Sequence, residues 1–166
     1  MSAILSCDLG TTGNRAILFS ESGEELVSHY EEFPQYYPQA AWVEHDALEI
    51  WNSCLNTIQT VVAQSKQPIK GLAITNQRET TVLWNKKTGQ PIHNAIVWQC
   101  RRSTDRCHAL ADKAQLIRQK TGLPLDPYFS ATKIEWLLQN VEGATALAEQ
   151  GDLCFGTIDT WVLWNL

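Results

Sequence analysis

The chain has 166 residues, of which 44% are hydrophobic and 19% charged, a composition typical of a soluble globular protein that can bury one ordinary core. Its formal net charge is -5 and its lysines and arginines are scattered along the sequence, so we expect no nucleic-acid partner. The apolar runs are too short to span a bilayer and no secretion signal opens the chain, which predicts a cytoplasmic protein without a membrane span.

The cysteine and histidine patterns indicate neither disulfides nor a structural metal. The five cysteines are an odd number without a C-x-x-C pair, so we predict reduced thiols that act mainly as small core residues. The four histidines are dispersed and include no i, i+4 pair that would form a metal site.

The chain is predicted to open as a β-meander. Apolar runs over Ala3–Cys7 and Arg15–Phe19 flank a polar, glycine-containing loop at residues 10–14, which is the pattern of a hairpin. After a turn at residues 21–24, Leu26–Phe33 can return as a third antiparallel strand.

A long helix follows this meander. Asp46 is expected to cap it, with Glu49 completing a capping-box pattern, and the helix runs to about Ser65. Its core face is predicted from apolar residues at helical spacing, namely Leu48, Trp51, Leu55, Ile58, Val61 and Val62.

The rest of the chain alternates short strands and helices. Strands are predicted over Ile69–Thr75, Thr81–Trp84, Ala95–Trp98 and Leu153–Phe155. Helices are predicted over Arg101–Ala111, Gln115–Lys120 with Gly122 as its C-cap, Ala131–Val141, and from Thr157, a capping residue, onward. This order predicts an α/β domain with a mixed sheet and helices on its faces. Because the last helix has no closing signal at Leu166, we expect a truncated domain.

The loop between the first two strands carries groups suited to phosphate and magnesium. Glycine lets the backbone approach an anionic oxygen, the threonines donate amide and hydroxyl hydrogens, and Asp8 can hold Mg²⁺ directly or through water. The candidate phosphate-binding residues are Gly10, Thr11, Thr12, Gly13, Asn14 and Arg15. An ordinary polar hairpin is the alternative.

A second candidate site centres on Arg78 and Glu79. A guanidinium beside a carboxylate can grip adjacent hydroxyls of a small polyol, although a structural ion pair is the alternative. Trp98 can cover the C–H side of the polyol and Tyr128 can supply a further hydrogen bond. The remaining tryptophans that we assign to the core are Trp51, Trp136, Trp161 and Trp164.

Several segments resemble known kinases. Residues 8–15 resemble the first phosphate-binding loop of the sugar kinase, Hsp70 and actin superfold, in which an Asp-x-Gly-Thr-Thr/Ser pattern joins two strands. Segments along the whole chain are similar to signatures of the glycerol kinases within the FGGY carbohydrate kinase family, namely residues 42–46, 71–81, 94–102, 121–123 with 126–133, and 155–161. Two departures are Leu9 in place of glutamine and Gly13-Asn14 in place of Ser-Ser.

This resemblance implies a ribonuclease H-like fold and MgATP-dependent phosphorylation of glycerol to glycerol 3-phosphate. It implies that Arg78, Glu79 and Tyr128 bind glycerol hydroxyls, that Trp98 lines the same pocket, and that the parent protein is a homo-oligomer. Residues 1–166 would be the N-terminal portion of the first domain, without the adenine-binding domain and catalytic base, so we expect the chain alone to be inactive.

Some alternatives remain open. A kinase of another sugar or polyol is one, which the intact run from Asn76 to Thr80 argues against, and a non-catalytic polyol-binding fragment is another, which the short length favours. Asp126 and Asp159 could be mistaken for catalytic carboxylates. We interpret both as structural, because Asp126 lies in a turn before a proline and Asp159 lies in the first turn of a helix.

Overall fold

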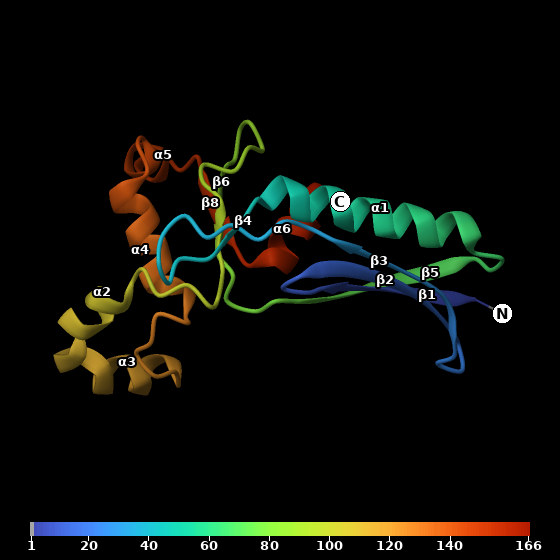
Figure 1. Cartoon of the computed structure of the whole chain (residues 1–166), viewed down its shortest axis with the longest axis horizontal. Coiled ribbons are helices and arrows are strands. Elements are labelled where there is room, and N and C mark those ends of the chain that lie inside the picture. The colour runs from blue at the N-terminus through green and yellow to red at the C-terminus, as the bar shows by residue number, and fades with distance from the viewer. Residues whose placement is uncertain (1) are drawn as a thin grey trace. The chain divides into compact units, whose positions relative to one another are not determined.

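The structure, a computed structural model, describes residues 2–166, which form two compact units (Figure 1). Unit 1 comprises residues 2–35, Asp46–Arg78 and Thr157–Leu166. Unit 2 comprises Tyr36–His45 and Glu79–Gly156. Each unit is therefore assembled from segments that are distant in the sequence.

Unit 1 is built on a four-stranded mixed sheet. Its strands are β1 (Ala3–Leu9), β2 (Gly13–Ser20), β3 (Glu25–Glu32) and β5 (Ile69–Asn76), in the order β3-β2-β1-β5. β1 and β5 are parallel, whereas β1–β2 and β2–β3 are antiparallel. The predicted meander and mixed sheet are confirmed.

Helix α1 (Ala47–Gln64) lies along one face of this sheet, against β2 and β3 (Figure 1). It begins where predicted, because the Asp46 carboxylate accepts hydrogen bonds from the backbone N–H groups of Leu48 at 2.7 Å and Glu49 at 3.4 Å. These bonds satisfy donors that the helix leaves unpaired at its first turn.

The predicted core face of α1 is partly wrong. Leu48 and Val62 are exposed, at 37% and 45% of their surface. Val61 is buried as predicted, but the rest of the buried stripe is Ile50 and the smaller residues Ala47, Ser53, Cys54 and Thr57. Thr57 can be buried because its hydroxyl donates to the carbonyl of Cys54 at 2.8 Å, and small side chains let the helix approach the sheet closely.

Helix α6 (Ile158–Asn165) packs on α1 and β5. Thr157 is its N-cap residue, as predicted. Its side chain makes no cap hydrogen bond, however, and donates to the Asp159 carboxylate instead. Trp161 is fully buried and its indole N–H donates to the carbonyl of Ala47 at 2.7 Å. Trp164 is 44% exposed, so its assignment to the core is wrong.

Unit 2 contains two short antiparallel sheets. One pairs β4 (Glu44–His45) with β7 (Ala95–Ile96), and the other pairs β6 (Val82–Asn85) with β8 (Leu153–Gly156). Their shared core is formed by buried residues that include Leu83, Ile96, Cys100 and Leu137.

The helices of unit 2 follow the predicted order with one addition. They are α2 (Thr104–Ala109), a 3-10 turn at Ala111–Lys113, α3 (Ala114–Thr121), α4 (Ser130–Asn140) and α5 (Ala144–Glu149). Gly122 ends α3 with φ 76°, a left-handed conformation that glycine adopts without strain, as predicted. α5 was not predicted and is only six residues long.

Most of the cysteines are small core residues, as predicted. All five are free thiols, and Cys7, Cys54, Cys100 and Cys107 are buried. Among residues 2–166, no helix is both long enough and apolar enough to cross a membrane.

A buried arginine fastens the framework of unit 2. The guanidinium carbon of Arg102 lies 4.0 Å from the ring centre of Trp42 and 4.6 Å from that of Trp136. Its Nη2 donates to Glu44 Oε1 at 2.6 Å, while Glu44 Oε2 accepts from the Asn94 side chain at 3.1 Å. Cation–π contacts and a charge-assisted hydrogen bond thus join the segment before β4 to α4 and to the segment before β7.

Replacement of Arg102 should destabilise the protein far more than replacement of its neighbour. Arg102→Met is expected to lower the free energy of unfolding by about 3–5 kcal/mol, because Glu44 stays buried without its arginine. Arg101→Met is the matched control, since Arg101 pairs with the exposed Asp126 and should cost about 0–1 kcal/mol. Urea unfolding followed by tryptophan fluorescence measures the free energy of unfolding of both variants. Equal losses of stability would show that Arg102 does not hold the framework of unit 2.

Candidate functional site

In unit 1, the loop between β1 and β2 is closed tightly by its own backbone. The N–H of Gly10 donates to the carbonyl of Gly13 at 3.0 Å. A Cβ atom at Gly10 would lie 2.8 Å from that carbonyl oxygen, and one at Gly13 would lie 2.6 Å from the carbonyl oxygen of Glu31. Both glycines are therefore required by close backbone contacts, which keep the loop compact.

Asp8 and Arg15 share one face of the sheet beside this loop. They are opposite one another in the β1–β2 register, so both side chains point to the same face, and both are exposed. The Arg15 guanidinium lies 5.4 Å from the ring centre of Tyr30, whose hydroxyl is 3.3 Å from that of Thr12. An acidic, a basic and a hydroxyl side chain thus lie at this end of the sheet.

Asn14 differs from the other predicted phosphate-binding residues. Its side chain is buried, and its amide donates to the carbonyl of Ile50 at 2.9 Å and to the hydroxyl of Ser53 at 2.6 Å. Because it is buried, this side chain cannot contact a phosphate bound at the loop. Asn14 instead fastens β2 to α1, and only its backbone can contribute to the loop.

Arg78 follows β5 at the same edge of the sheet as the loop. The carboxyl ends of the parallel strands β1 and β5 lie side by side. Gln77 joins them, because its backbone N–H donates to the carbonyl of Leu9 at 2.7 Å and its side-chain amide donates to the carbonyl of Gly10 at 3.0 Å. Arg78 is exposed. No role was predicted for Gln77, although it lies beside Arg78 within residues 71–81.

In unit 2, Glu79 has an unusual backbone conformation. Its φ is 67°, in the left-handed region that residues with a side chain seldom adopt. Its carboxylate Oε2 accepts from the backbone N–H of Ser130 at 3.1 Å and from the Ser130 hydroxyl at 2.9 Å. Because Ser130 is the first residue of α4, the carboxylate caps that helix from outside and lies at its positive end.

The carbonyl of Glu79 is held as firmly as its carboxylate. It accepts from Lys133 Nζ at 2.8 Å and from the Thr81 hydroxyl at 3.2 Å. Glu79 is thus fixed through both its backbone and its side chain, as a strained residue requires.

Trp98 and Tyr128 complete the group of predicted polyol residues in unit 2. Their ring centres are 6.0 Å apart at an interplanar angle of 64°, and both side chains are half-buried. The backbone N–H of Trp98 donates to the hydroxyl of the buried Thr80 at 3.3 Å, one residue after Glu79. Three of the four predicted polyol residues are therefore linked in one unit by described contacts.

Lys133 links two of these residues, although no role was predicted for it. Its side chain is fully buried, and its ammonium donates to the carbonyls of Glu79 and Tyr128. Burial lowers the pKa of Lys133 to about 8, while the Glu79 carboxylate opposes that shift. Its position four residues after Phe129 and four before Leu137, on the buried face of α4, is the signal that would have found it.

The carboxylates of Asp126 and Asp8 differ in their surroundings. Asp126 accepts from the backbone N–H of Tyr128 at 2.8 Å and from Arg101 at 3.1 Å, which confirms its structural role. Across residues 2–166, no group of three or more His, Cys, Asp or Glu is placed to hold a metal ion. A single carboxylate such as Asp8 still suits Mg²⁺, which commonly keeps several waters and takes its other ligands from phosphates.

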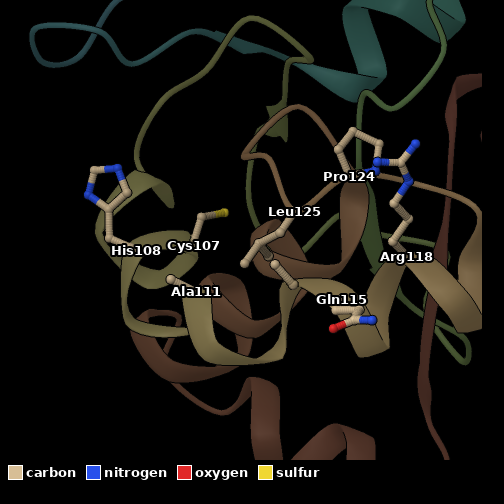
Figure 2. A pocket seen from close by; sticks show the side chains of 8 residues that line it. Cys107, His108, Ala111, Gln115, Arg118, Pro124 and Leu125 are labelled. Carbon is tan, nitrogen blue, oxygen red and sulfur yellow. The ribbon is translucent and has the colours of Figure 1, made fainter.

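A cavity of about 540 Å³ lies elsewhere in unit 2 (Figure 2). α2 contributes Cys107 and His108 to its lining, α3 contributes Gln115 and Arg118, and the loop after α3 contributes Leu125. None of the predicted polyol or phosphate residues lines it, so we do not assign the candidate site to this cavity.

Comparison with known proteins identifies the family. Residues 3–166 match the N-terminal domain of the FGGY family of carbohydrate kinases. The chain is 56% identical to a glycerol kinase of Geobacillus sp. (strain WCH70) and 54% identical to one of Clostridium botulinum (strain Langeland), over 98% of this chain and 34% of each relative.

Solved structures agree with this match. A crystal structure of Plasmodium falciparum glycerol kinase with ADP has a TM-score of 0.94 and 34% sequence identity, covering all of this chain and 34% of that one. The predicted fold, that of the sugar kinase, Hsp70 and actin superfold, is confirmed, and the chain spans about a third of the length of these relatives. The chain belongs to the FGGY family of carbohydrate kinases.

Proposed function

We propose that this chain supplies the polyol-binding residues and the first phosphate-binding loop of an ATP-dependent glycerol kinase, which forms glycerol 3-phosphate. The observation that carries the proposal is the cluster in unit 2, where a fixed carboxylate, Glu79, is linked through hydrogen-bonded neighbours to the rings of Trp98 and Tyr128. The glycerol kinases among the relatives support the choice of substrate.

The chemistry of these residues suits a small polyol. The Glu79 carboxylate accepts hydrogen bonds from hydroxyl groups, and Arg78, the preceding residue, donates them. The half-buried aromatic rings of Trp98 and Tyr128 offer apolar surface to the C–H groups, and the Tyr128 hydroxyl adds a further polar contact. Such a site fixes the orientation of a terminal hydroxyl, which phosphoryl transfer needs above all.

The loop at residues 10–15 is proposed to bind the phosphates of ATP, with Asp8 serving Mg²⁺. Mg²⁺ would neutralise charge on the phosphates. The exposed Arg15 supplies a positive charge, Thr11 and Thr12 supply hydroxyl groups, and Gly10 and Gly13 keep the backbone compact. Asn14 contributes through its backbone only, since its side chain is bonded to α1.

The chain is proposed to be the N-terminal portion of the first domain of such a kinase. The resemblance implies a catalytic base outside residues 1–166, and the chain spans about a third of the relatives. We therefore expect the 166-residue chain alone to consume no ATP in the presence of glycerol.

The polyol site is tested in a chimaera in which this chain replaces the matching third of the Geobacillus glycerol kinase. The chimaera should phosphorylate glycerol, and Arg78→Ala should lower kcat/KM for glycerol by about 30- to 1000-fold, equivalent to about 2–4 kcal/mol. The exposed Arg118 provides the control variant Arg118→Ala, which should leave kcat/KM unchanged. A folded chimaera that phosphorylates xylulose but not glycerol, or an Arg78 variant with unchanged kcat/KM, would refute the proposal.

Asn14 and Arg15 are expected to have different roles, the Asn14 side chain a structural one and the Arg15 side chain a phosphate-binding one. Asn14→Ala should lower the free energy of unfolding by about 1–3 kcal/mol, because Ile50 and Ser53 lose a buried hydrogen-bonding partner. Arg15→Ala should change stability by less than about 0.5 kcal/mol but raise the KM for MgATP in the chimaera. Urea unfolding and initial-rate kinetics measure the two effects, and the opposite assignment would show that the side-chain roles are reversed.

A further inference from the structure

Lys133 is an ionisable residue in a place that normally holds an apolar one. It lies on the face of α4 that carries Leu137, and its side chain has no exposed surface. Removing an ammonium group from water is unfavourable unless the group gains close acceptors. With a pKa lowered to about 8 by burial, Lys133 is still mainly protonated at neutral pH, so its hydrogen bonds are charge-assisted.

The acceptors of Lys133 are backbone carbonyls of two residues of the proposed polyol site. Nζ donates to Glu79 and to Tyr128, which are far apart in the sequence, and lies 5.9 Å from the Tyr128 ring centre. An apolar residue of similar length would fill the same space without joining the two segments. The ammonium therefore joins two chain segments by hydrogen bonds, which packing alone would not do.

The hydrogen bond from Lys133 to the Glu79 carbonyl stabilises the left-handed conformation of Glu79. A left-handed residue with a side chain tends to relax to a negative φ, and rotating the adjoining peptide would turn its carbonyl away from Lys133 and Thr81. The same rotation would carry the Glu79 carboxylate away from Ser130. The direction of the carboxylate and the conformation of the backbone are thus coupled.

We propose that Lys133 is a positioning residue of the polyol site. Lys133 holds Glu79 in its left-handed conformation and links it to Tyr128, so that both residues can contact the same substrate molecule. This inference rests on the proposed function, since it takes Glu79 and Tyr128 as polyol ligands. Lys133 itself contacts backbone only and need not touch the polyol.

The test uses the isotope-labelled 166-residue chain and Lys133→Met, whose side chain has similar length and no charge. In the variant, backbone couplings should show that Glu79 has left positive φ, and the dissociation constant for glycerol, measured by NMR titration, should rise at least 10-fold. The urea midpoint should stay equal or rise, because no ammonium is buried. The exposed Lys120 provides the control Lys120→Met, which should change neither Glu79 nor glycerol affinity.

Further variants separate failure of this inference from failure of the proposed function. If Glu79→Gln weakens glycerol binding while Lys133→Met leaves both affinity and the Glu79 φ unchanged, Lys133 is not a positioning residue although the polyol site stands. If the wild-type chain binds no glycerol, its proposed polyol-binding role fails, and the Glu79 φ in Lys133→Met still decides whether Lys133 holds this backbone.

A wild-type measurement covers the case in which Lys133→Met does not fold. The Lys133 ammonium hydrogens should exchange slowly with water and show scalar couplings across their hydrogen bonds to the Glu79 and Tyr128 carbonyls. Rapid exchange without these couplings would overturn the proposal, whatever the variant does.

Discussion

The candidate site of unit 2 depends on a single backbone constraint, the left-handed conformation of Glu79. Such a conformation costs about 1–3 kcal/mol, so it persists only where neighbouring groups stabilise it. Here the carboxylate caps α4 through Ser130, and the carbonyl accepts from Lys133 and Thr81. The strain of one residue is thus offset by the start of a helix, a buried cation and the strand that follows.

This constraint determines what surrounds Glu79. The buried Thr80, the next residue, positions the backbone of Trp98, while Lys133 connects Glu79 with Tyr128. The Arg102 cluster has a structural role instead. Its contacts with Trp42, Trp136 and Glu44 hold the framework of unit 2 together and include none of the proposed polyol-binding residues. Polar residues that look alike in the sequence therefore divide into those proposed to contact a substrate and those that hold segments together.

The sequence predicted features that depend on local patterns. The meander, the Asp46 cap and the Gly122 C-cap follow from turn residues and hydrophobic spacing, and the structure confirms them. Features that depend on contacts between distant segments were missed: the buried Asn14 side chain, the small-residue face of α1 and the role of Lys133. A positive φ at a glutamate leaves no distinctive pattern of residue types. Helical spacing could have placed Lys133 on the buried face of α4, but it does not show which carbonyls its ammonium meets.

The central claim is that Glu79, Trp98 and Tyr128 together receive a polyol, and intermolecular NOEs with ¹³C-labelled glycerol test it most directly. The account predicts NOEs from the glycerol C–H groups to the ring hydrogens of Trp98 and Tyr128 in the wild-type chain, and their loss in Glu79→Gln. Glycerol NOEs that arise only from the cavity lined by Ala111 and Leu125, and persist unchanged in Glu79→Gln, would contradict it.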